Sequence, residues 1–178
     1  MMDRAAGSSR RIQSPSQTVG PFFHFCLTPD ATLGKLFPDA ASRLRLAVSV
    51  VDGAGQPVTD AVVEIWQMRD APGGDAAFGR LATDDAGACE FDTVRPCQPA
   101  GGGAAHINVC LFARGLLRQL HTRIYFADDP HQAHDPVLAL VPEPRRATLL
   151  ARPDASRPGR WTFDIRLQGM HETVFFDV

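Results

Sequence analysis

The chain has 178 residues, of which 44% are hydrophobic, and a formal net charge of -2 at pH 7. This length suits one domain with a substantial core, and the near-neutral charge argues against nucleic acid or an anionic membrane as the main partner. No apolar run approaches the roughly 20 residues that cross a bilayer, and the first residues lack the apolar block of a signal peptide, so we expect a cytoplasmic protein. The four cysteines have no Cys-x-x-Cys spacing, which argues against zinc or a disulfide framework.

Residues 1–13 show no hydrophobic periodicity and are expected to form a flexible tail ahead of a single domain over residues 14–178. The domain starts with residues 14–25, which contain two prolines and end in three phenylalanines. The prolines disfavour a regular helix or a central strand, whereas the phenylalanines need to be buried. We therefore expect an extended arm pinned by its aromatic side chains, either against its own domain or against a partner subunit.

Most of the remaining chain alternates apolar and polar residues, as is typical of strands. Strands are expected at residues 44–50, 61–67, 78–83, 88–94, 106–113, 121–126, 161–168 and 172–177. Residues 145–152 are the only plausible helix. Because turns rich in Gly, Pro and Asp separate the strands, the sequence predicts an antiparallel β-sandwich with long loops and at most one or two short helices.

The strand at residues 106–113 carries the densest set of polar groups. Its alternation puts His106 and Asn108 on one face, and His121 is expected on the next strand along the chain. A catalytic iron or zinc site needs at least three protein ligands, and strand ligands usually come as His-x-His. Asn108 is a poor ligand for such ions, so hydrogen-bonded packing residues are the simpler interpretation. No Gly-x-Ser-x-Gly elbow or phosphate-binding glycine motif is present.

Seven short motifs follow one another along the chain. They are SPSQTVGPF (residues 14–22), EIWQ (64–67), FGR (78–80), HIN (106–108), LFARG (111–115), HTRIYF (121–126) and FDIRLQG (163–169). Together they resemble the intradiol ring-cleavage dioxygenases over nearly the whole chain. The resemblance implies a β-sandwich that opens the ring of 3,4-dihydroxybenzoate with O2 at a ferric ion. In the family, two tyrosines and the two histidines of a His-x-His strand hold that ion.

The chain departs from this ligand pattern. Its single tyrosine, Tyr125, matches neither ligand tyrosine, and His106-Ile107-Asn108 replaces the His-x-His. A ferric ion favours anionic oxygen ligands, and one tyrosine cannot supply two phenolates. The resemblance therefore implies that this chain has no catalytic residue and no metal ligand. It also implies a hetero-oligomer, in which a homologous iron-binding subunit holds Fe(III) and this chain completes the pocket for the small aromatic substrate and O2.

The resemblance also assigns substrate-pocket roles to four residues of this chain. Thr18, Gly20 and Pro21 match an arm segment that lines the cavity at the subunit interface, and Arg114 matches an arginine at the pocket mouth. An arm stiffened by prolines loses little entropy when it is laid across a partner, and Arg114 could offer a forked cation to a carboxylate. The alternatives are packing of the arm without substrate contact and a structural ion pair for Arg114.

A different class of protein, a prealbumin-like β-sandwich that serves only as a binding or interaction module, shares the strand and turn pattern of residues 50–66. Such modules are shorter. They lack the strand that contains His106 and the closing segment over residues 160–177, which favours the dioxygenase resemblance.

Overall fold

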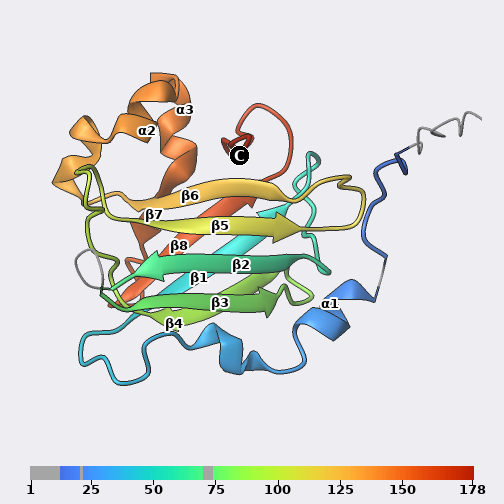
Figure 1. The fold of residues 1–178 in the computed structure, drawn as a ribbon, viewed down its shortest axis with the longest axis horizontal. Coiled ribbons are helices and arrows are strands. Elements are labelled where there is room, and N and C mark those ends of the chain that lie inside the picture. Colours follow the sequence, from blue (N-terminus) through green and yellow to red (C-terminus); the bar gives the residue numbers. More distant parts are fainter. Residues whose placement is uncertain (1–12, 21, 70–73) are drawn as a thin grey trace, which may run out of the picture.

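The computed structural model describes residues 13–20, 22–69 and 74–178 (Figure 1). The expected flexible tail falls almost wholly on residues 1–12, which lie outside the described residues. Within the described residues, eight strands pair edge to edge in one continuous series. In spatial order they are β3 (Ala76–Ala82), β2 (Val62–Met68), β5 (His106–Phe112), β6 (Leu120–Phe126), β7 (Leu150–Pro153), β8 (Arg160–Arg166), β1 (Leu44–Val51) and β4 (Ala88–Thr93).

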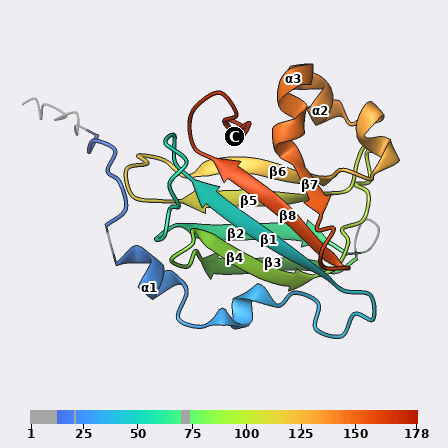
Figure 2. The same cartoon turned by 180° about the vertical axis from the view of Figure 1, so that it is seen from behind.

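The series folds over into two layers. Strands β3, β2, β5 and β6 form the front layer in Figure 1, while β8, β1 and β4 form the rear layer that faces the viewer in Figure 2. Strand β7 joins the layers, because it pairs in parallel with β6 and antiparallel with β8. The predicted β-sandwich is confirmed. It is mostly antiparallel, and the parallel pairs β6–β7 and β1–β8 are additions that the sequence pattern did not predict.

The core lies between the two layers and follows the two-residue period of the strands. In β1 the buried face carries Leu46, Val48 and Val50, and in β5 it carries Ile107, Val109 and Leu111. Burying each such side chain contributes about 1.5–3 kcal/mol. Because a shift of one residue would expose the whole apolar set of a strand, this pattern also fixes the pairing register of neighbouring strands.

A segment before β1 covers the edge where the two layers meet. It contains the 3-10 turn Ala31–Gly34, which contacts both β3 and β4. Leu36 then donates its backbone N–H to the Asp92 carbonyl of β4 at 2.9 Å. The turn packs closely against β3, because a Cβ atom added at Gly34 would lie only 2.8 Å from the Leu81 side chain of β3.

The helices are short, and they are where the sequence prediction was least accurate. The described residues contain three α-helices, α1 (Phe23–Leu27), α2 (Pro136–Leu140) and α3 (Glu143–Arg146), so the expected one or two was too low. The helix predicted over residues 145–152 was wrong, because this stretch divides among the end of α3, a 3-10 turn and β7. None of the helices described is long and apolar enough to cross a membrane.

The strand predicted over residues 172–177 was also wrong. This segment makes only an isolated bridge, in which the Phe176 N–H donates to the His121 carbonyl of β6 at 2.8 Å. Thr173 is buried and its hydroxyl accepts a hydrogen bond from the Arg166 N–H at 2.9 Å. The segment is therefore tied down at single points, and a continuous ladder does not form.

Candidate functional site

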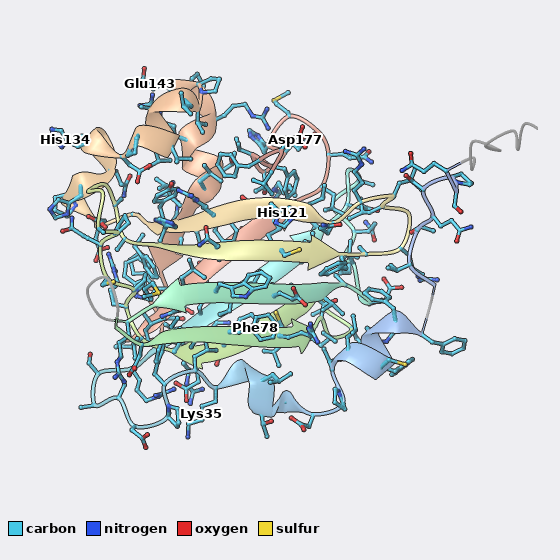
Figure 3. The ribbon with its side chains drawn as sticks, in the orientation of Figure 1. Lys35, Phe78, His121, His134, Glu143 and Asp177 are labelled. Carbon is cyan, nitrogen blue, oxygen red and sulfur yellow. The ribbon has the colours of Figure 1, made fainter. Side chains whose placement is uncertain are left out.

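The outward face of the front layer gathers most of the polar and aromatic groups that the sequence singles out. Trp66 of β2 lies beside Phe78 of β3 on one side and beside Asn108 of β5 on the other. Asn108 in turn lies beside Arg123 of β6. Figure 3 shows Phe78 and His121 on different strands of this layer. The strand register therefore builds one row of side chains across four strands.

The register also answers whether His106 and His121 could share a metal ion. His106 pairs with Tyr125, whereas His121 pairs with Cys110, four residues further along β5. At about 3.3 Å per residue, the two positions lie roughly 13 Å apart along the strand. The two histidines are therefore not brought together. Among the described residues, no group of three or more His, Cys, Asp or Glu side chains converges as a metal site.

The residues beside His106 do not fit a ferric ion. Tyr125 is fully buried and its hydroxyl donates to Asp135 Oδ1 at 3.1 Å. Burial raises the pKa of Tyr125 to about 12, and this single tyrosine cannot supply two phenolate ligands. Asn108 adds only a neutral amide.

Two buried aspartates fix the backbone that leads into β5. Asp135 accepts hydrogen bonds from the N–H groups of Ala104, Val137 and Leu138 and from the Tyr125 hydroxyl. Asp129 accepts from the Ala105 N–H at 2.9 Å and from the His131 N–H at 2.9 Å. Together they hold the residues immediately before His106 against the α2 region.

These aspartates were not among the residues predicted from the sequence, although a local signal was present. Each is followed directly by proline, in Asp129-Pro130 and Asp135-Pro136. An aspartate before a proline is a typical helix start, because the carboxylate caps free N–H groups and proline suits the first helical position. Asp129 caps the 3-10 turn Pro130–His134, and Asp135 caps α2.

These carboxylates make the stability of the chain sensitive to acid. Burial raises the pKa of Asp135, but the hydrogen bonds from Leu138, Ala104, Tyr125 and Val137 outweigh it and hold the pKa below its usual value of 3.8. A lowered folded-state pKa stabilises the native state above the unfolded pKa, and this stabilisation is lost as the pH falls through the folded value.

We expect the contribution of Asp135 to the free energy of unfolding to be nearly constant above about pH 5 and to fall below about pH 4, whereas His106, whose pKa is lowered by burial, adds a decline that begins near its unfolded pKa of about 6.5. Urea unfolding at a series of pH values measures it. In Asp135→Asn the side chain no longer titrates, so the acid decline should be shallower. If the free energy of unfolding of this variant fell with acid as steeply as that of the wild type, other carboxyl groups would be responsible for the acid sensitivity.

A cavity of about 560 Å³ opens on the outward face, at the end where β5 begins. Its walls include Trp66 and Phe78, whose ring centroids lie 5.1 Å apart with the planes tilted by 50°. His106 and Asn108 supply polar atoms on β5, and Pro99 belongs to the long loop before it. A neighbouring hollow of about 400 Å³ shares Trp66 and Asn108 but is also lined by charged residues, including Arg123 and Asp177.

Two of the predicted pocket residues, Thr18 and Arg114, lie at the opposite end of β5. Thr18 Oγ1 accepts a hydrogen bond from the Gly115 N–H at 2.8 Å, so the arm contacts the loop that carries Arg114. Arg114 is exposed, and its Nε lies against Asp60 Oδ2 in an ion pair. Gly20 is exposed nearby along the arm, and Pro21 lies outside the described residues. The structure thus brings Thr18 next to Arg114, and the ion pair considered as an alternative for Arg114 is present.

The arm also exposes large aromatic side chains. Phe22 and Phe25 are 71% and 64% exposed, and their ring centroids lie 6.3 Å apart. Rings of this size are seldom left adjacent in water unless another surface covers them.

The fold matches solved structures of one class of protein. None of the protein-family models matches the chain. A dioxygenase domain from Streptomyces sp. SirexAA-E is similar with a TM-score of 0.63 and 25% identity, over 90% of this chain and 98% of that one. An intradiol ring-cleavage dioxygenase from Tetranychus urticae has a TM-score of 0.59 at 16% identity, over 78% of this chain and 87% of that one. The fold is that of the intradiol dioxygenases.

Sequence relatives narrow this class further. The chain is 42% identical to the protocatechuate 3,4-dioxygenase alpha chain of Burkholderia cepacia, over 93% of this chain and 98% of the relative. The alpha chain of Pseudomonas putida is also 42% identical, over 93% and 96%. The beta chain from Burkholderia cepacia is 31% identical, over 89% and 77%. This chain belongs to the family of protocatechuate 3,4-dioxygenase alpha chains. The resemblance found in the sequence is confirmed, and the prealbumin-like alternative is set aside.

Proposed function

We propose that this chain is the alpha subunit of a protocatechuate 3,4-dioxygenase, in which a homologous beta subunit binds Fe(III). The complex would cleave 3,4-dihydroxybenzoate with O2 to 3-carboxy-cis,cis-muconate, and both oxygen atoms would enter the product. The observation that carries the proposal is 42% identity to two alpha chains in a chain that has a single tyrosine, the buried Tyr125, and the neutral Asn108 in place of the second histidine of a His-x-His motif. The 31% identity to a beta chain supports two subunits of one fold.

In this proposal, the contribution of the chain is to bind and orient the substrate. Thr18, Gly20 and Pro21 would form one wall of the pocket on the beta subunit, and Arg114 would lie at its mouth. The hydrogen bond between Thr18 and Gly115 supports this grouping, because it holds the arm beside Arg114. The guanidinium group of Arg114 presents a planar fork of donors that matches a carboxylate such as that of the substrate.

The same proposal gives the exposed arm aromatics a role. Phe22 and Phe25 would be covered by the beta subunit, which would remove their apolar surface from water. Residues 14–178 would act as one domain with residues 1–13 as a tail, and the complex would be cytoplasmic. These last points remain predictions from the sequence.

Expression of the chain with and without its homologous partner tests the proposal. We expect a colourless, iron-free and inactive protein from the chain alone, and a red complex that contains iron and consumes O2 with 3,4-dihydroxybenzoate from the pair. Iron analysis, visible absorption and O2 uptake measure the three properties. Iron and activity in the chain alone would contradict the assignment.

A variant of the chain alone provides a sharper control. Asn108→His restores the His-x-His pattern in β5 but supplies no phenolate. Because the single tyrosine of the chain, Tyr125, stays buried with its hydroxyl bound to Asp135, the variant should still form no coloured ferric complex. A coloured ferric complex in Asn108→His would mean that the missing tyrosines do not decide where the iron binds.

A further inference from the structure

A small polar cavity of about 240 Å³ lies on the rear layer, over β7 and β8 and beside the turn that follows β8 (Figure 2). On β8, Thr162, Asp164 and Arg166 line it, and they share the outward face because they alternate with the buried Phe163 and Ile165. Pockets for drug-sized molecules have volumes of about 300–1,000 Å³. This cavity therefore suits a smaller ligand.

Two arginines of this cavity lack the partners that another arginine of the layer has. Arg152 of β7 pairs in register with the β8 position four residues before Arg166. Both side chains are exposed, and within the described residues neither makes a hydrogen bond or an ion pair. Arg160, at the start of β8, instead pairs with Glu90 and Asp154 at 2.8 Å each. The cavity thus presents two guanidinium groups, each a planar fork of donors that matches a carboxylate.

The turn that carries His171 forms a fixed wall of the cavity. The Thr173 hydroxyl accepts from the Arg166 N–H at 2.9 Å, and the Thr173 N–H donates to the Arg166 carbonyl at 2.9 Å. The Val174 N–H donates to the hydroxyl of Thr148, in the 3-10 turn Ala147–Leu149, at 3.2 Å. A neutral imidazole donates one hydrogen bond in either tautomer. His171 therefore adds a donor on backbone that is already ordered, which lowers the entropic cost of binding.

Asp164 restricts which anions fit between the two arginines. It lies on β8 between Arg166 and the position beside Arg152, and its Oδ1 accepts from the Ser49 hydroxyl at 2.5 Å. At about 3.3 Å per residue, the two arginine positions lie roughly 13 Å apart along the strand. A compact anion midway between them would meet the like charge of Asp164. A ligand with two separated carboxylates places each charge beside an arginine and away from the aspartate.

We propose that this cavity binds a small linear dicarboxylate, one carboxylate on Arg152 and the other on Arg166, with His171 as a further donor. The site lies on the rear layer, whereas Arg114 follows β5 of the front layer, and the proposal does not depend on the subunit role of the chain. It is a binding site, with no reaction assigned to it.

Calorimetric titration of the full chain with glutarate, at a fixed ionic strength of about 0.15 M, tests the proposal. We expect one molecule to bind per chain. Monomethyl glutarate has the same length but one charge, and sulfate has two charges but is compact. Each should bind at least about tenfold more weakly than glutarate, because neither can pair with both arginines across Asp164. Equal binding of either probe, or no binding of glutarate, would overturn the proposal.

Two matched variants locate the site. Arg166→Gln removes one cation from the cavity and should weaken glutarate binding about tenfold. Arg157→Gln makes the same change at an exposed position of the turn before β8 and should leave binding unchanged. If the chain does not stay folded alone, the variants are compared in the complex with the homologous partner, where any binding to the partner is common to both. Equal affinities of the two variants would rule out the cavity as the site.

A third variant tests the role given to the aspartate. Asp164→Asn keeps an oxygen that accepts from the Ser49 hydroxyl but removes the negative charge. Sulfate binding should then strengthen severalfold and by more than glutarate binding. If the ratio of the two affinities did not change, the spacing of the two charges would not select the ligand, and the choice of a dicarboxylate would be wrong.

Discussion

Replacing Arg114 with alanine in the reconstituted complex is expected to raise the KM for 3,4-dihydroxybenzoate by about tenfold to a hundredfold, with kcat and iron content nearly unchanged. The magnitude follows from the loss of a charge-assisted hydrogen bond to a carboxylate, worth about 1.5–3 kcal/mol. Because this contact is made equally in the ground and transition states, its loss appears in KM. Steady-state O2 uptake and iron analysis measure the three quantities.

Two control variants separate substrate binding from local structure. Arg118→Ala removes an exposed arginine from the same loop and should leave KM unchanged. Asp60→Asn removes the charge that faces Arg114 while keeping the guanidinium group, so KM should rise far less than in Arg114→Ala. If Arg114→Ala and Asp60→Asn lowered stability equally and neither changed KM, Arg114 would be only the ion-pair partner of Asp60.

Replacing Asp135 with alanine is expected to lower the free energy of unfolding by about 3–5 kcal/mol, at about 1 kcal/mol for each lost bond and more where a buried donor stays unpaired. The carboxylate is 2% exposed and accepts hydrogen bonds from three backbone N–H groups and from the Tyr125 hydroxyl. Urea unfolding of the chain measures the change.

A graded series checks the origin of this effect. Tyr125→Phe removes one of the four donors and should cost about 1 kcal/mol. Asp85→Ala changes an exposed aspartate and should stay within about 0.5 kcal/mol of the wild type. If Asp135→Ala cost no more than Asp85→Ala, the hydrogen bonds around Asp135 would not anchor the start of β5.

The sequence predicted the strands well because burial of one face imposes a two-residue period on each of them. In β5 this period places Ile107, Val109 and Leu111 inside and leaves His106 and Asn108 outside, as expected. It carries no information on which strand lies beside which. The parallel pairing of β1 with β8 joins segments more than a hundred residues apart and depends on packing of the whole core.

The candidate site could be predicted only in part, because the sequence pattern does not tell which strands lie side by side or in which register. The sequence alone shows that the iron ligands of the family are missing from this chain. It contains a single tyrosine, Tyr125, and it has Asn108 where a His-x-His motif has its second histidine. The roughly 13 Å offset of His121 from His106 depends on the register of β5 with β6, which a single sequence does not give. The contact between Thr18 and Gly115 joins positions 18 and 115, and no local pattern predicts it.

The segment that contains the turn Ala31–Gly34 has a consequence for the behaviour of the chain before and during assembly. Strands β3 and β4 are the two ends of the strand series, and unpaired sheet edges readily add strands of other molecules. The Leu36 N–H occupies the Asp92 carbonyl on β4, while Arg43 binds Asp92 and the carbonyls of Leu36 and Phe37. The segment thus covers the edge of β4 and disfavours pairing of this edge with a strand of another molecule. A proteolytic cut within the segment would expose the β4 edge of an otherwise intact sandwich.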